Sequence, residues 1–195
     1  FIDSLLADDD RTEQLIAIQA LSFALDTGSR SSDHSFQFGS RRRGDEWHPK
    51  TIGEQNTWLR DALRRLLPIA CQGGELAEKA RTAIAGDIRD LICIGLADDV
   101  ALSMREIRGR VFWPEGWRHL CLAMHFDQNS WPQNVREQMD QLEHEQRPAT
   151  SDERFSVYVI GDPWGLYPPD PEDDDHERQR MSDLAENLGR AVGAA

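Results

Sequence analysis

An all-α fold is predicted for this chain of 195 residues by three features of its sequence. Apolar side chains recur every three or four positions through most of the chain, which is the spacing of one buried helix face. Short breaks rich in Gly or Pro separate these stretches. Sustained alternation of apolar and polar residues, the signal of a half-buried strand, is confined to residues 154–160. About seven helices of ordinary length follow from this pattern.

The first helix is expected over residues 11–26. Asp10 or Thr12 can cap its start, and Gly28 can end it in the left-handed conformation that glycine adopts easily. Residues 28–53 show no sustained period and are rich in Ser, Gly and Arg, so we expect a long connection, of a kind that is often functional. The apolar stripe of the helix consists of Leu15, Ile18, Leu21 and Leu25, widened by Ile16, Ala20 and Phe23.

Three further helices are expected in the middle of the chain. Thr51 and Glu54 have the Thr-x-x-Glu spacing of a capping box, in which each side chain accepts a backbone N–H of the other residue. Pro68 lies late in the first of the three and should kink or end it. The acids Asp98 and Asp99 suit the N-terminus of the last one. The three helices are expected over residues 51–71, 75–95 and 98–108.

The next two helices are expected on either side of a polar break. The first covers residues 114–126 and opens on Pro114, whose missing N–H costs nothing in a first turn. Asn129 or Ser130 is expected to cap the second, which ends near Gln146.

The C-terminal part is less regular. Residues 154–160, RFSVYVI, carry the Val and Tyr side chains that favour a strand. A lone strand needs a partner, and no other strand is predicted, so a buried helix and a short extended segment both stay open. We expect a Pro- and acid-rich loop over residues 161–175 and a final helix over residues 176–192.

The predicted helices come in consecutive pairs, with roughly 40 residues per pair. This organisation favours a HEAT-like helical array, and an irregular helical bundle is the competing architecture. We expect residues 1–195 to form a single helical domain. Because the sequence begins at Phe1 without Met and with helical character, we also expect it to be a segment of a longer polypeptide.

The composition points away from two classes of partner. A net charge of -13 repels nucleic acid and anionic membranes and favours basic partners. The longest near-apolar run, residues 91–97, is too short to cross a bilayer, and no signal peptide is visible. The three cysteines, Cys71, Cys93 and Cys121, lie among apolar residues, so we expect buried thiols and a cytoplasmic location.

A basic segment interrupts this acidic chain. The segment from Gly39 to Arg65 contains seven basic and four acidic residues, so its net charge is +3. The rest of the chain then carries a net charge of -16. Such a segment can bind phosphate, an acidic peptide or a nucleic-acid backbone, with aromatic stacking in support. The competing interpretation, which we favour, is that its arginines pair with acids of the same protein. The interaction candidates in the loop are Arg41, Arg42, Arg43, Trp47 and Lys50.

Aromatic residues gather in two further places. Trp113 and Trp117 are expected to pack between helices. Trp164 and Tyr167 lie in the polar, Pro-rich loop and are candidates for contact with another protein, since Trp and Tyr are enriched at interfaces.

No catalytic, cofactor-binding or metal-binding motif stands out. His119 and His125 are six apart, which does not place them on one helix face. Cys121 lies between two leucines and is expected to be a core thiol rather than a nucleophile. His144 and His176 have acidic neighbours, but adjacent residues on a helix diverge, so we predict no metal site and no cofactor.

One stretch resembles a known group of proteins. The run Gly39, Arg43, Trp47, Pro49, Lys50, Thr51, Glu54 and Trp58, followed by Leu63, Leu66 and Leu67, is similar to segments in the helical-repeat regions of large bacterial proteins. Some of these carry a STAND-type NTPase module elsewhere and act in signalling or defence. The resemblance covers the first half of the chain and implies a scaffold or sensor part of a multidomain protein. It does not bring NTPase chemistry, because the Gly-x-x-x-x-Gly-Lys-Ser/Thr phosphate cradle is absent from the sequence.

The sequence therefore predicts a non-catalytic helical scaffold, interaction or regulatory segment of a larger cytosolic bacterial protein, in signalling or defence. Its expected partner is a protein, either elsewhere in the parent chain or separate. The alternative is a module that senses nucleic acid or phosphate through the basic loop at residues 39–50.

Overall fold

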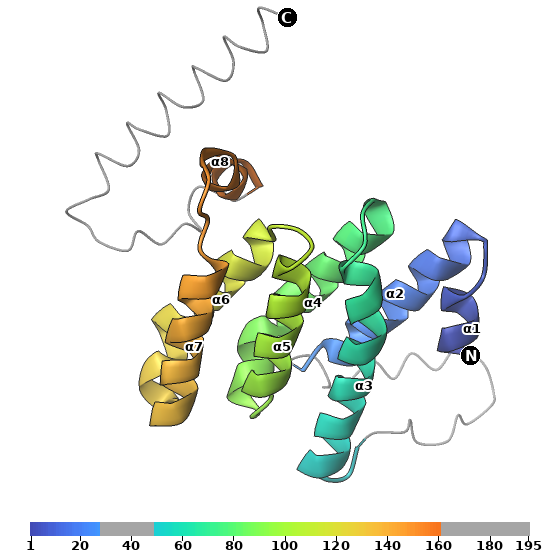
Figure 1. Ribbon diagram of the computed structural model, residues 1–195. Coiled ribbons are helices and arrows are strands. Elements are labelled where there is room, and N and C mark those ends of the chain that lie inside the picture. The colour runs from blue at the N-terminus through green and yellow to red at the C-terminus, as the bar shows by residue number, and fades with distance from the viewer. Residues whose placement is uncertain (28–48, 161–195) are drawn as a thin grey trace, which may run out of the picture.

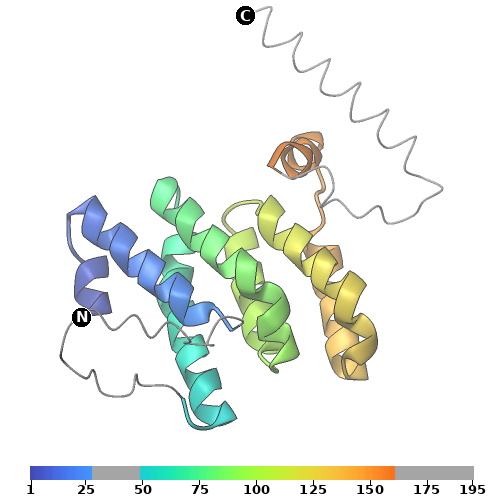
Figure 2. The ribbon, with the colours of Figure 1, turned by 180° about the vertical axis from the view of Figure 1, so that it is seen from behind.

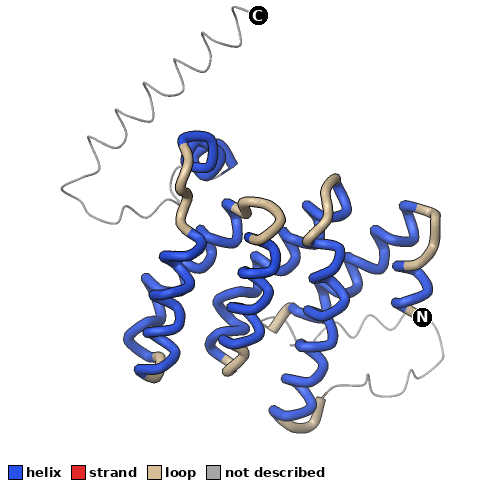
Figure 3. The backbone as a smooth tube through the Cα atoms, viewed as in Figure 1, coloured by secondary structure: helices blue, strands red, loops and turns tan. Residues whose placement is uncertain are grey.

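The computed structural model describes residues 1–27 and 49–160, and within these ranges the protein is all-α, as predicted. Figure 3 shows helices and loops, with no strand, in this part of the chain. None of the helices described is long and apolar enough to cross a membrane. The helices are α1 (Ile2–Leu6), α2 (Arg11–Leu25), α3 (Ile52–Ala70), α4 (Glu75–Cys93), α5 (Ala97–Arg108), α6 (Pro114–Asp127), α7 (Gln133–Gln146) and α8 (Ser151–Ile160), with a 3-10 turn at Gln128–Ser130.

The helices form two layers. In Figure 1, α3, α5 and α7 lie side by side in front, and in Figure 2 the reverse view brings α2, α4 and α6 forward. Helices α4, α6 and α8 begin at residues 75, 114 and 151, which are intervals of 39 and 37 residues, while α2 begins 64 residues before α4. The two-layer arrangement and the spacing from α4 onward fit an array of paired helices, which is one of the two predicted architectures.

The hydrophobic core lies between the two layers. Leucine, isoleucine and methionine side chains from both layers are fully enclosed, as the spacing of apolar residues predicted. Trp113 is buried, in line with its expected packing role, and Trp131 is buried as well. Trp117 is half-buried and donates its indole N–H to Glu143 Oε1 at 3.1 Å. The largest enclosed side chains include Leu59, Leu66, Ile84, Ile88, Leu91, Met104, Ile107, Leu120, Met139 and Leu142.

Two of the predicted N-caps are confirmed. Asp10 Oδ1 accepts the backbone N–H of Thr12 at 2.7 Å at the start of α2. Thr51 Oγ1 accepts the backbone N–H of Glu54 at 3.1 Å at the start of α3. The return bond of this capping box shifts by one residue, because Glu54 Oε2 accepts the N–H of Lys50 at 2.7 Å.

The middle helices end slightly differently from the prediction. Pro68 lies inside α3, which ends two residues later at Ala70. Helix α4 ends at Cys93 rather than at Gly95, because Gly95 adopts a φ of 92° that turns the chain out of the helix. The N–H of Gly95 then bonds to Ile92 O at 3.1 Å, and the N–H of Leu96 bonds to Leu91 O at 2.9 Å. These two bonds make a Schellman cap, and they direct the chain straight into α5.

The expected cap of α7 is wrong. Ser130 Oγ donates to Asp127 O at 2.7 Å and closes the 3-10 turn. Helix α7 starts at Gln133, after Pro132, and no side chain caps it. Neither Asn129 nor Ser130 therefore serves as the N-cap, because the intervening turn separates them from the helix.

Residues 154–160 belong to α8, so the extended alternative is wrong. A second Thr-x-x-Glu signal at residues 150–153 explains the helix. Thr150 Oγ1 accepts the N–H of Glu153 at 3.2 Å, and Glu153 Oε2 accepts the N–H groups of Ala149 at 2.7 Å and Thr150 at 3.4 Å. This box fixes a first helical turn ahead of the Val- and Tyr-rich stretch and outweighs its strand propensity.

Three other predictions need correction, and three more lie outside the described ranges. Ile16 and Phe23, expected to widen the buried stripe of α2, are 56 % and 69 % exposed. All three cysteines were expected to be buried, but Cys93 is exposed and Cys71 and Cys121 are only partly buried; all three are free thiols. The predicted connection at residues 28–53 ends earlier, since α3 begins at Ile52. The proposed stop at Gly28, the loop at residues 161–175 and the helix at residues 176–192 lie outside the described residues.

Candidate interaction surface

Most of the predicted interaction residues fall outside the described ranges. Lys50 is exposed, and its backbone N–H is held by Glu54 as described above. The candidates that lie outside the described residues are Arg41, Arg42, Arg43, Trp47, Trp164 and Tyr167.

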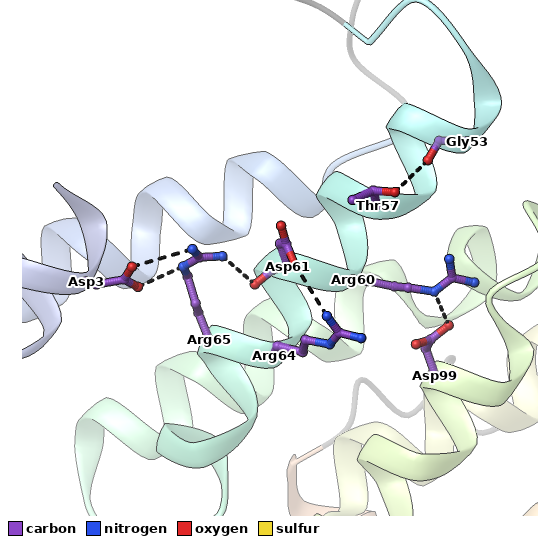
Figure 4. Close-up of polar contacts among 8 residues, drawn as sticks. All are labelled: Asp3, Gly53, Thr57, Arg60, Asp61, Arg64, Arg65 and Asp99. Carbon is purple, nitrogen blue, oxygen red and sulfur yellow. Dashed lines mark hydrogen bonds and ion pairs between the residues drawn. The ribbon is translucent and has the colours of Figure 1, made fainter.

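The described arginines of the basic segment pair with acids of the same protein (Figure 4). Arg60 Nε lies 2.9 Å from Asp99 Oδ2, which joins α3 to α5. Arg65 Nε lies 2.8 Å from Asp3 Oδ1 and joins α3 to α1, and this bond lowers the pKa of Asp3 and raises that of Arg65. Pairing with the protein's own acids therefore accounts for this part of the segment.

Other arginines join neighbouring helices in the same way. Arg89 pairs with Asp127 between α4 and α6, and Arg105 pairs with Glu145 between α5 and α7. Arg108 makes two bonds to Glu153 of α8, of 2.6 and 3.2 Å. Each pair links helices whose residues are about 40 positions apart in sequence, so these arginines fix the alignment of successive helix pairs.

A groove runs along the seam between α2 and α4. Its volume is about 530 Å³. Phe23 stands at its rim with 69 % of its surface exposed. Ile16, seven residues earlier, lies on the same side of α2 and is also exposed. The groove is lined by Leu15, Ile18, Gln19, Ser22, Phe23 and Asp26 of α2 and by Lys79, Thr82, Ala83, Gly86 and Asp87 of α4.

Small residues on α4 keep the groove open. Ala83 and Gly86 are one turn apart and both contribute to its wall. A Cβ atom built on Gly86 would meet no atom within 4 Å. The space beside Gly86 is therefore open, and a side chain from outside the described fold can enter it.

One end of the groove is acidic. Asp26, at the end of α2, and Asp90, one turn after Asp87 on α4, both act on the Asp87 carboxyl. Partial burial, and then the charges of Asp26 and Asp90, raise the pKa of Asp87 to about 6. Asp90 Oδ2 also accepts a hydrogen bond from Thr27 Oγ1 at 2.8 Å. Helix α2 ends at Leu25, so its carbonyl-rich terminus adds negative partial charge to a site that already carries carboxylates.

The described residues offer little for metal binding or nucleophilic catalysis. Within residues 1–27 and 49–160, no group of three or more His, Cys, Asp or Glu side chains is placed to hold a metal ion. Burial, with a further contribution from Glu143, raises the pKa of Cys121 to about 12, which suits a core thiol. Burial and the neighbouring Arg118 lower the pKa of His119, so this imidazole is neutral at physiological pH.

A second groove lies between the C-terminal ends of α3 and α5. Its volume is about 770 Å³, and its lining includes Cys71, Arg105 and Arg110. None of the large apolar side chains exposed on the described surface lies in it. The groove between α2 and α4 is therefore the better candidate for an interaction with an apolar ligand surface.

Sequence reasoning did not find this surface. Asp26 and Asp87 are far apart in the sequence, and Phe23 was assigned to the core. Gly86 was the one local signal, because a glycine inside a helix-forming pattern often has a packing or functional reason. No family model, curated protein or solved structure matches the chain. The function of the chain is therefore inferred from the geometry of the groove.

Proposed function

We propose that this chain is a helical scaffold that binds another protein through the layer formed by α2, α4 and α6. The observation that carries the proposal is the groove between α2 and α4, with Phe23 exposed at its rim and an open wall at Gly86. Exposed aromatic side chains beside a hollow are typical of protein-binding surfaces. The fold supplies a frame for such a surface, because α4 packs against α2 and α6 of its own layer and against α3 and α5 of the other.

The charge distribution supports a protein ligand over a nucleic acid. The chain carries a net charge of -13, and the described arginines nearest the basic loop, Arg60 and Arg65, are bound to carboxylates. The groove itself ends in carboxylates, which repel phosphate. A nucleic-acid- or phosphate-sensing role would have to use Arg41, Arg42 and Arg43, outside the described residues.

The resemblance of residues 39–67 to helical-repeat regions suggests the setting for this role. We extend the proposal to a scaffold or regulatory part of a larger cytosolic bacterial protein that acts in signalling or defence.

Photo-crosslinking tests the proposal. A photoreactive benzoylphenylalanine would replace Phe23 in the groove, and in a second variant it would replace Leu102, which is 56 % exposed on α5 in the other layer. Each variant is irradiated in an extract of the source organism, and adducts are identified by mass spectrometry. We expect a discrete protein adduct at Phe23 and none at Leu102. Equal labelling at both positions, or labelling by nucleic acid at Phe23, would contradict the proposal.

A further inference from the structure

We infer that the partner presents a basic segment with an apolar neighbour, and that this segment lies along the groove between α2 and α4. Its Lys or Arg side chain meets the carboxylate of Asp87 at the acidic end of the groove, and its apolar side chain lies over Gly86 and against Phe23. The inference rests on the proposed function, since it names the chemistry of the partner for the same surface.

Gly86 supplies the first argument. Its backbone φ is not positive, because the glycines with positive φ in the described chain are Gly74 and Gly95. Nothing in the described fold fills the space that its side chain would occupy. Glycine in the middle of a helix is less stable than alanine, so neither backbone geometry nor internal packing explains it here. An apolar side chain that approaches closely from a partner accounts for both the glycine and the open space.

The carboxylates supply the second argument. Asp87 makes no hydrogen bond or ion pair to another residue in the described part of the chain, although it is half-buried and close to Asp26 and Asp90. Among the described arginines of α2 and α4, Arg89 is bound to Asp127 and Arg11 to Glu75. Lys79 contributes to the lining, but it lies two turns before Asp87 on α4. A cation from a partner would stabilise the ionised carboxylate of Asp87 and form a partly desolvated ion pair with it.

The apolar and acidic features lie next to each other along one line. Phe23 precedes Asp26 by three residues on α2, and Gly86 directly precedes Asp87 on α4. A ligand therefore needs a cation and an apolar group within about one helical turn of each other. This requirement favours an amphipathic peptide segment over an isolated metal ion, and a group with metal-binding placement is not found in the described residues.

The experiment uses the full chain and a defined probe. The probe is a fluorescein-labelled amphipathic helical peptide built from Leu and Lys, and binding is followed by fluorescence anisotropy at about 0.15 M salt. The groove variant is Asp26→Asn/Asp87→Asn. The control is Asp9→Asn/Asp140→Asn, which makes the same change in net charge at two exposed positions away from the groove. A third variant, Gly86→Phe, fills the open space.

We expect the groove variant to weaken binding about tenfold or more, and the control variant to weaken it less than about threefold. Gly86→Phe should weaken binding about tenfold while its circular dichroism and thermal midpoint stay close to those of the parent chain. Equal weakening in the groove and control variants would mean attraction by general charge, and would overturn the inference. Unchanged binding in Gly86→Phe would overturn it as well.

The crosslinking experiment separates this inference from the proposed function. Protein adducts at Phe23 that are insensitive to Asp26→Asn/Asp87→Asn would overturn a basic ligand and leave the scaffold role intact. Adducts from Phe23 onto residues 28–48 of the same chain would identify the chain's own basic segment as the occupant and overturn a separate partner.

Discussion

Substitution of Asp87 by Asn should stabilise the fold at neutral pH. The pKa of this carboxyl is raised from 3.8 to about 6 in the folded protein by burial and by the charges of Asp26 and Asp90. Ionised Asp87 therefore disfavours the folded state, and the stability of the parent chain should fall as pH rises from about 4 to about 6 and then level off. Asn keeps the shape of the side chain and carries no charge, so the stability of the variant should not fall over this pH range.

The magnitude follows from the shift. A difference of about two pKa units corresponds to about 3 kcal/mol at 1.36 kcal/mol per unit. Because Asp87 is only half-buried, screening by solvent reduces the expected gain to about 1 kcal/mol at pH 8. A gain of this size raises the thermal midpoint by about 2–4 °C in a domain of this length.

Urea unfolding followed by circular dichroism at pH 4 and pH 8 measures the effect. We expect Asp87→Asn to be more stable than the parent chain at pH 8 and close to it at pH 4. Asp140→Asn, which removes an exposed carboxylate on α7, should change stability by less than about 0.5 kcal/mol at both pH values. A stability gain of the same size at both pH values, or a loss at pH 8, would refute the electrostatic account of the acidic end of the groove.

The remaining predictions concern packing and capping. Gly86→Ala should raise the free energy of unfolding by about 0.5–1 kcal/mol, since its Cβ meets open space and alanine favours the helix. Gly116→Ala should lower it by about 1–3 kcal/mol, since its Cβ would clash with the indole ring of buried Trp113. Urea midpoints of the two variants measured side by side check both signs, and shifts in the same direction would contradict the described packing. Glu153→Gln should destabilise the chain at neutral pH, because Arg108 holds the pKa of Glu153 at about 2. The difference in free energy of unfolding between the variant and the parent chain should decrease as pH drops from 4.5 toward 2. A difference that does not change with pH would contradict the role of the ion pair.

Local signals predicted most of the fold. Side-chain caps at Asp10 and Thr51 and the apolar spacing within α3 and α4 act over a few residues, so they can be read directly from the sequence. The same capping signal at residues 150–153 directly precedes a Val- and Tyr-rich stretch whose strand propensity points the other way. Glu153 binds both its own helix start and Arg108 of α5, so local capping and a distant partner together hold α8.

The candidate surface could not be read in the same way. It depends on α2 lying beside α4, with the basic segment and α3 between them in sequence. The exposure of Phe23 shows the difficulty, since its spacing fits the buried stripe of α2 but its side chain lies at the groove rim. Sequence spacing identifies the apolar residues of a helix, but the neighbouring helix decides which of them it covers.

The most direct test of the central claim compares the two classes of ligand on the same protein. The full chain is titrated at about 0.15 M salt with the labelled Leu/Lys peptide and, separately, with labelled duplex DNA and single-stranded RNA, and fluorescence anisotropy is recorded. The account predicts saturable binding of the peptide, weakened by Asp26→Asn/Asp87→Asn, and no saturable binding of either nucleic acid. Saturable, salt-sensitive nucleic-acid binding that is lost in the Arg41→Ala/Arg42→Ala/Arg43→Ala variant, together with no groove-dependent peptide binding, would contradict it.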